Sequence, residues 1–168
     1  GFEKISSDKS IAERTMTLMD FYKIKPEDVS LDNFGVGANV AMEIALASRQ
    51  RINAVYVGQP ARERTQYENL RAEAYFKTRE WLRKGGELVY DSRWEELLSV
   101  RYKRDLSGRV KIMSKDKMRQ HGIKSPDVAD ALALSFITAP GSYLPGGAQG
   151  LEREQLSDRE IADTVKIY

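Results

Sequence analysis

The segment that most constrains the fold is the apolar stretch that follows Ser125-Pro126 near the end of the chain. We expect Ser125 to act as the N-cap of a helix and Pro126 to take its first position, where a missing N–H costs nothing and a fixed φ suits the helix. Residues 128–137 are apolar almost all round such a helix, so it must be packed inside a domain. Yet Asp127 and Asp130, three residues apart, share one face of its first turn.

Two explanations are open for these acids. First-turn carboxylates often only complement the positive end of the helix dipole, at roughly 0.3–1 kcal/mol each. A ligand-binding role is favoured by a third acid, Asp32, which follows the short apolar segment 29–31 and precedes a turn at Gly35 and Gly37. An acid at the carboxyl end of a strand in an open α/β sheet lies where ligands usually bind, although an Asp-Asn pair also forms ordinary turns.

Composition narrows the class of protein. At 168 residues with 41% hydrophobic content, the chain can bury one sizeable core. Its net charge of +2 is nearly neutral, so a nucleic-acid role has to be argued from local clusters of charge. The chain has no cysteine, which excludes disulfides and thiolate metal sites and fits a reducing compartment. We find neither an apolar run as long as a membrane span nor a signal-peptide pattern, so we expect an intracellular protein.

Helix and strand patterns alternate along the chain. Helices are expected over residues 8–22, 37–49, 67–84 and 92–100, and strands over 29–31, 52–57 and 88–90. Residues 100–105 and 109–113 have the pattern of a β-hairpin. Strands that alternate with helices predict an α/β fold, and the hairpin suggests a mixed sheet. We expect residues 141–168 to form a flexible linker and an amphipathic tail, outside a domain of residues 1–140.

The hairpin opens a strongly basic segment. Between Arg101 and Lys124, nine basic residues oppose two acids, a local balance of +7. Basic residues hold phosphates and acids hold metal ions, so this segment beside the acid-bearing helix suits cleavage of a phosphodiester, although a solvent-exposed hairpin would carry similar charges. Tyr102 is the one aromatic residue of the segment, so base stacking is not indicated. The candidate DNA-binding residues are Arg101, Lys103, Arg104, Arg109, Lys111, Lys115 and Lys117. Lys115 is also a candidate for neutralising charge that develops in a reaction, against the alternative of an ordinary surface lysine.

Four segments together resemble the nuclease domain of large terminase subunits from tailed bacteriophages. They are Asp32-Asn-Phe-Gly-Val-Gly, Tyr67-Glu-Asn-Leu-Arg-Ala-Glu-Ala-Tyr-Phe, Lys111-Ile-Met-Ser-Lys-Asp-Lys-Met-Arg and Ser125-Pro-Asp-Val-Ala-Asp-Ala-Leu. The resemblance covers roughly residues 1–140 in order. It implies an α/β fold with an RNase H-like mixed sheet flanked by helices, similar to the RuvC-type junction resolvases.

The resemblance also implies a function. Members of the family are endonucleases that cut concatemeric viral DNA while the genome is packaged, with Mg²⁺ or Mn²⁺ held by acids in a two-metal site. Asp32, Asp127 and Asp130 match the catalytic, metal-binding acids. The implied partners are double-stranded DNA and, through the parent protein, the portal and the small terminase subunit. The implied location is the host cell cytoplasm, with no membrane involved.

One element of the family pattern is not found. The first metal-binding acid belongs to the first strand, which we expect a few tens of residues before Gly1, so the chain is expected to lack the first strand or strands. Neither Glu3 nor Asp8 has a matching context. We therefore expect residues 1–168 alone to cut DNA feebly. A RuvC-like resolvase or transposase-type nuclease, and a non-catalytic DNA-binding or assembly module, are the alternatives.

Overall fold

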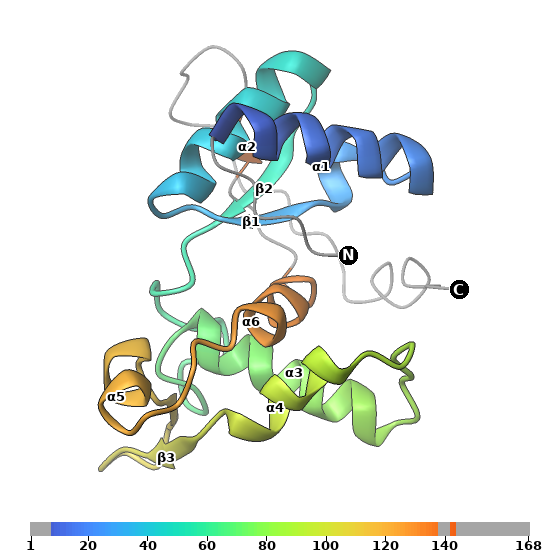
Figure 1. The fold of residues 1–168 in the computed structure, drawn as a ribbon. Coiled ribbons are helices and arrows are strands. Elements are labelled where there is room, and N and C mark those ends of the chain that lie inside the picture. The colour runs from blue at the N-terminus through green and yellow to red at the C-terminus, as the bar shows by residue number, and fades with distance from the viewer. Residues whose placement is uncertain (1–7, 138–141, 144–168) are drawn as a thin grey trace.

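A small mixed sheet organises the fold (Figure 1). The computed structural model describes residues 8–137 and 142–143. In it, β1 (Ser30–Asp32) runs parallel to β2 (Ile52–Val55), and β2 pairs antiparallel with β5 (Ser142–Tyr143). The register places Asp32 opposite Val55, so the carboxyl ends of the two parallel strands meet at one edge of the sheet.

Helices α1 (Asp8–Tyr22) and α2 (Val36–Ser48) cover one face of this sheet (Figure 1). The sequence of α2 is rich in small apolar residues, which let helix and sheet approach closely. A first core forms between these helices and β2, from Ala12, Met19, Val40, Ala41, Ile44, Ala45, Ile52 and Ala54. The short 3-10 helix η1 (Pro26–Asp28) connects α1 to β1.

A second core lies on the opposite face of the sheet, against α3 (Leu70–Arg83) and α6 (Asp127–Leu134). Successive side chains of a strand point to opposite faces, so Ile52 and Ala54 enter the first core while Val55 enters the second. Figure 1 shows α6 between the sheet and α3. The result is a layered α/β arrangement with helices on both faces of the sheet.

The remaining elements extend from α3. They are η2 (Ser92–Glu95), α4 (Glu96–Ser99), the antiparallel strands β3 (Tyr102–Arg104) and β4 (Val110–Ile112), and α5 (Lys115–Gln120). The hairpin is anchored to α3 because Val110 and Ile112 are buried in the second core. None of the helices within the described residues has the length and apolar character that a membrane crossing requires.

The mixed α/β sheet and the hairpin are confirmed, but three predictions about these elements were wrong. The hairpin forms a two-stranded sheet of its own and does not join the mixed sheet. Residues 88–90 form no strand, and Val89 and Tyr90 are 83% and 92% exposed. Helix α3 begins at Leu70, three residues later than expected, because the side chain of Asn69 accepts a hydrogen bond from Ala72 N at 3.0 Å and so caps the helix there.

Two other segments differ from expectation, and a third lies outside the described residues. Residues 92–100 were expected to form one helix, and a 3-10 turn followed by a single α-turn stands in its place. β5 lies inside the segment that was expected to be a linker. Residues 144–168, with the expected amphipathic tail, are not among the described residues, so the domain division stays a prediction.

Candidate active site

Strand β1 holds Asp32 on the face of the sheet that α6 covers. Leu31 packs against the first core on the side of α1 and α2, so its neighbours Ser30 and Asp32 point the other way. The Ser30 hydroxyl donates to the carbonyl of Ile137 at 3.5 Å, which ties the strand to the residues that follow α6. A Cβ at Gly37 would lie 2.0 Å from the Asp32 carbonyl oxygen, so glycine is needed for α2 to begin this close to the acid.

The Asp32 carboxyl has an unsatisfied oxygen. Its Oδ1 is buried and has no hydrogen-bond partner among the described residues. Burial raises the pKa of Asp32 and the charge of Asp130 raises it further, whereas Lys115 and Arg71 lower it. A buried oxygen without a donor is costly for a protein, and a cation or a proton would relieve that cost.

The first turn of α6 is capped by tertiary structure, and the prediction that Ser125 caps it was wrong. Pro126 is the N-cap residue, and Ser125 Oγ donates to Asp127 Oδ1 at 2.6 Å instead. The cap is supplied by Glu96 of α4, whose Oε2 accepts hydrogen bonds from Val128 N at 2.7 Å and Ala129 N at 3.2 Å. Two amides that a helix leaves unpaired are thereby satisfied by a carboxylate that also complements the helix dipole.

The two oxygens of Asp130 have different partners. Its Oδ1 accepts hydrogen bonds from Tyr75 Oη at 2.5 Å and from Arg71 Nε and Nη2 at 3.1 and 3.0 Å. Its Oδ2 lies 2.9 Å from Nζ of Lys115. Oδ1 is therefore bound by residues of α3, while Oδ2 faces Lys115, the same cation that acts on Asp32.

Lys115 joins the acids of α6. Its Nζ lies 3.2 Å from Asp127 Oδ1 as well as 2.9 Å from Asp130 Oδ2. Burial opposes its charge, but hydrogen bonds and attraction to Asp130 and Asp127 raise the pKa of Lys115 overall. The hydrogen bond from Ser125 and the charge of Lys115 lower the pKa of Asp127. An isolated surface lysine is therefore not the right description of Lys115.

The structure brings two of the three predicted acids to one charged centre. Asp130 is 18% exposed and acts electrostatically on Asp32. Asp127 is 75% exposed, is joined to the centre through Lys115, and is not among the charges that act on Asp32. No group of three acidic, histidine or cysteine side chains in the described part of the chain is arranged to hold a metal ion.

The residues present nevertheless fit a hydrated divalent cation. Asp32 Oδ1 has no donor among the described residues, and Asp130 Oδ2 faces a lysine, a partner that can move away. Both are hard carboxylate oxygens, which Mg²⁺ and Mn²⁺ prefer, and Mg²⁺ is commonly held by one or two carboxylates while it keeps several waters. These two oxygens define the candidate metal centre.

Three residues of the centre were missed by sequence reasoning. Arg71 and Tyr75 position Asp130, and Glu96 positions the first turn of α6. The i, i+4 spacing of Arg71 and Tyr75 places them on one face of a helix, which was the available signal. Nothing in the sequence says that this face meets an acid 55 to 59 residues further along the chain.

The predicted DNA-binding residues differ in the ion pairs and hydrogen bonds that they form within the protein. Arg109 pairs with Asp105 at 2.8 Å, and Lys111 pairs with Glu68. Arg101 and Arg104 donate to the carbonyls of Leu98 and Gly108 at 2.6 and 2.7 Å. Lys103 and Lys117 are exposed, and neither forms an ion pair with another described residue. Asp105 is already counted in the +7 balance of this segment. Glu68, Asp127 and Asp130 lie outside it, so their pairs with Lys111 and Lys115 neutralise part of that balance within the fold.

Solved structures share the fold of this chain. Two of them are the nuclease domain of the large terminase subunit gp2 of bacterial virus Sf6, as a lysine-to-alanine variant with manganese and with calcium. Each is 21% identical to this chain with a TM-score of 0.57, and the match covers 76% of this chain and 72% or 71% of the other. This chain has the fold of those terminase nuclease domains. The expected RNase H-like mixed α/β class is thereby confirmed. No family model and no curated relative matches the sequence.

Proposed function

We propose that this chain is the metal-dependent endonuclease domain of a viral DNA-packaging terminase large subunit, which cuts concatemeric double-stranded DNA as the genome is packaged. The observation that carries the proposal is the unpaired, buried Oδ1 of Asp32 beside Asp130 and Lys115, in a fold shared with terminase nuclease domains. The manganese and calcium in the Sf6 structures support divalent metal use. The portal and the small terminase subunit are the proposed partners of the parent protein, and the host cell cytoplasm is the proposed location.

In this proposal Asp32 and Asp130 hold the metal, and Asp127 joins them in a two-metal site with Mg²⁺ or Mn²⁺. When bound, divalent ions would supply polarisation of the phosphodiester and a water of lowered pKa. Arg71 and Tyr75 keep Asp130 turned so that its Oδ2 faces the centre. Lys115 supplies a positive charge close to both acids of α6, where it would offset negative charge that develops on a phosphate.

The duplex is proposed to lie along the hairpin and α5. Lys103 and Lys117 are the freest cations there, and Arg101, Arg104, Arg109, Lys111 and Lys115 add charge from positions that also serve the fold. Such contacts go to phosphates and carry no sequence information, so binding is expected to be non-specific and sensitive to salt.

The test is cleavage of supercoiled plasmid with Mn²⁺ or Mg²⁺. The proposed function belongs to a terminase large subunit, so the assay uses that parent protein beside residues 1–168. We expect the parent protein to cut, and Asp32→Asn or Asp130→Asn in it to abolish cutting. Asp28→Asn removes an exposed carboxylate close to β1 and should leave cleavage unchanged. Cleavage that persists in Asp32→Asn would refute the proposed site.

A non-catalytic DNA-binding module is the second candidate. It is favoured by the finding that no three acids within the described residues are arranged around a common metal position. Calorimetric titration with Mn²⁺ separates the two. Saturable binding that Asp32→Asn removes supports the nuclease, whereas DNA binding without any Asp32-dependent metal binding supports the module.

A further inference from the structure

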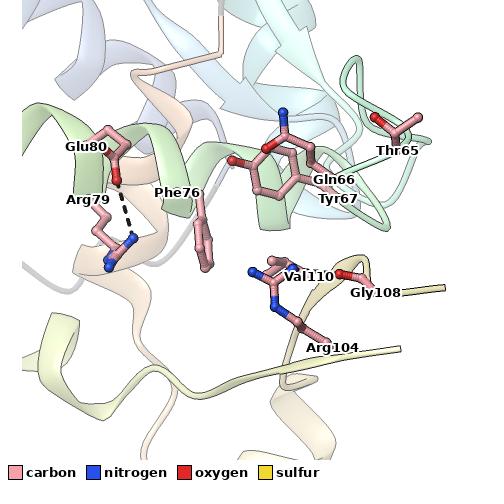
Figure 2. A pocket seen from close by; sticks show the side chains of 9 residues that line it. All are labelled: Thr65, Gln66, Tyr67, Phe76, Arg79, Glu80, Arg104, Gly108 and Val110. Atoms are coloured by element: carbon pink, nitrogen blue, oxygen red, sulfur yellow. Dashed lines mark hydrogen bonds and ion pairs between the residues drawn. The ribbon is translucent and has the colours of Figure 1, made fainter. Parts of the chain in front are cut away.

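A groove lies beside α3, where Phe76, Arg79 and Glu80 line it (Figure 2). Other residues of the same helix, Arg71 and Tyr75, contact Asp130. Its volume is about 380 Å³, within the range of roughly 300–1,000 Å³ that small-ligand sites occupy. Three separate segments line it: the loop before α3, the middle of α3, and the β3–β4 hairpin. The lining residues are Thr65, Gln66, Tyr67, Phe76, Arg79, Glu80, Arg104, Gly108 and Val110.

One wall of the groove is aromatic. The ring centroids of Tyr67 and Phe76 lie 5.5 Å apart, with 55° between the ring planes. Phe76 and Tyr102 pack edge to face, with their ring centroids 5.1 Å apart. Tyr102 is 56% exposed. Tyr102 is the one aromatic residue of the basic segment, so base stacking was not expected there. The fold brings two more rings, Tyr67 and Phe76, to the hairpin from outside the segment, which makes stacking possible.

Two guanidinium groups stand beside this wall. Arg79 Cζ lies 5.5 Å from the centre of the Phe76 ring, and Arg79 pairs with Glu80 at 3.3 Å, as the dashed line in Figure 2 marks. Arg104 approaches from the hairpin and donates to the carbonyl of Gly108. Among the lining residues two arginines stand beside one glutamate, Glu80, while Glu63 and Glu73 also act on the phenol of Tyr67. An arginine has five N–H donors, so these contacts leave donors for a phosphate.

We propose that this groove binds one unpaired nucleotide of a DNA strand, with the base against Tyr67 and Phe76 and a phosphate at Arg79 and Arg104. The ligand follows from the chemistry of the walls, because flat rings suit a base and arginines suit a phosphate. Bases in a duplex are stacked on one another and the groove is too small for a duplex, so the nucleotide must be unpaired. An acidic peptide would satisfy the arginines but would leave the aromatic wall without a partner.

The inference rests on the proposed function, since it gives the nuclease a second contact with its DNA away from the acids. It needs no catalysis, however, and binding can be measured with EDTA present. The assay is fluorescence anisotropy of a labelled oligothymidylate, compared with a hairpin duplex. Loss of nuclease activity in Asp32→Asn and loss of oligothymidylate binding in groove variants are then independent results.

Two substitutions test the groove. Phe76→Leu keeps an apolar side chain but removes the flat ring, and we expect it to weaken oligothymidylate binding about fivefold or more, since base stacking contributes about 1–3 kcal/mol per base. Arg104→Ala should weaken the same complex by a similar factor. Lys103→Ala is the matched control, because it removes one charge from the same strand on its opposite face. It should reduce single-strand and duplex binding alike.

Photocrosslinking locates the base directly. An oligothymidylate that carries iododeoxyuridine should crosslink to the peptides that contain Tyr67 or Phe76. Crosslinks confined to other peptides, or unchanged oligothymidylate affinity in both Phe76→Leu and Arg104→Ala, would overturn the proposal. Displacement of the oligonucleotide by a lower concentration of an acidic peptide would also overturn it and would assign the groove to a protein partner.

Discussion

The ammonium group of Lys115 lies 2.9 Å from Oδ2 of Asp130, the oxygen that the hydrogen bonds of α3 leave open. Arg71 and Tyr75 both donate to the other oxygen, so the carboxylate presents one defined atom to the centre. In the absence of metal that atom is balanced by a cation of the protein. Lys115 and a divalent ion therefore compete for the same oxygen, and the affinity of the centre for metal depends on how firmly the lysine holds it.

The first prediction concerns this competition. Lys115→Ala removes a positive charge next to the proposed metal ligands, so we expect Mn²⁺ to bind more tightly by about fivefold, equivalent to about 1 kcal/mol. Isothermal titration calorimetry measures the change. Lys117→Ala removes the same charge two residues further along α5 from an exposed side chain and should alter the affinity little. Weaker Mn²⁺ binding in Lys115→Ala would show that the lysine supports the metal position and does not compete for it.

A second prediction follows from Tyr75, whose hydroxyl donates to Asp130 from a buried position. Burial and the charge of Asp130 raise the pKa of Tyr75 well above its usual range, so the phenol stays protonated in the folded protein. Tyr75→Phe should lower the free energy of unfolding by about 1.5–3 kcal/mol at neutral pH, since one hydrogen bond to a carboxylate is removed.

The stabilisation that Tyr75 provides should decrease at high pH. An unfolded tyrosine ionises near pH 10, whereas folded Tyr75 does not, so its contribution is complete below about pH 10 and declines as the pH rises further. Urea unfolding across this range should show the advantage of the wild type over Tyr75→Phe shrinking above about pH 10. Tyr56→Phe, at an exposed position, is the control. A difference that stays constant with pH would contradict the assignment.

The third prediction concerns the unpaired oxygen of Asp32. Asp32→Asn should stabilise the metal-free protein by about 1 kcal/mol at neutral pH, because an ionised carboxyl with a buried, unsatisfied oxygen is replaced by a neutral amide. The pKa of Asp32 is raised in the folded protein, so the wild type loses stability as the pH rises from the unfolded value near 3.9 through the folded one. The increase in the free energy of unfolding from Asp32→Asn should therefore disappear at acidic pH.

Mn²⁺ should make the wild type more stable than Asp32→Asn, the reverse of the order expected without metal. Mn²⁺ binds the folded wild type and so should raise its melting temperature, while Asp32→Asn should respond little. Thermal unfolding with and without Mn²⁺, and with Asp28→Asn as the exposed-carboxylate control, measures both effects. An equal Mn²⁺ response in wild type and Asp32→Asn would place the metal elsewhere.

Local sequence signals predicted the elements that carry the acids. Hydrophobic periodicity and turn-forming residues reveal properties of short segments. These include the alternation of strands and helices, the strand end at Asp32 and the helix start with Asp127 and Asp130. The contacts that position Asp130 and the first turn of α6 are not local. Arg71 and Tyr75 reach Asp130 across 59 and 55 residues, and Glu96 reaches the amides of Val128 and Ala129 across 32 and 33. Only the packing of α3 and α4 against α6 decides those contacts.

Contacts between distant segments also explain why some predictions were wrong. Ser125-Pro126 has the composition of a helix start, yet a carboxylate from another helix took the cap, and the serine hydroxyl turned to Asp127. Val89 and Tyr90 have strand propensity but meet no neighbouring strand, and propensity without a partner does not make a sheet. The aromatic wall of the groove was invisible for a related reason, since its rings come from different segments.

The fourth prediction concerns duplex binding. Lys103→Ala together with Lys117→Ala removes the exposed cations of the hairpin and α5 that pair with no other described residue. Affinity for duplexes of different sequence should fall by a similar factor, and the salt dependence should flatten by about 0.9 in slope for each phosphate that the protein no longer neutralises. Electrophoretic mobility shifts over a series of salt concentrations measure both. Lys25→Ala with Lys84→Ala, two exposed lysines outside the segment, is the control pair. Equal losses in the two pairs would mean that the hairpin and α5 have no special role.

The last prediction concerns Glu96, which holds the start of α6 through the amides of Val128 and Ala129. Glu96→Ala leaves both amides without their acceptor and should cost about 0.5–2 kcal/mol of stability, as the loss of a helix cap does. Hydrogen exchange of those two amides should accelerate more than exchange in α2, because the damage is local to α6. Glu95→Ala removes the neighbouring exposed carboxylate and should change neither quantity. Since the same turn carries Asp127 and Asp130, Glu96→Ala should also weaken Mn²⁺ binding, and Glu96→Gln should restore part of it because an amide oxygen can still accept. A variant with fast exchange at Val128 and Ala129 but undiminished Mn²⁺ affinity would show that the metal centre does not depend on this cap.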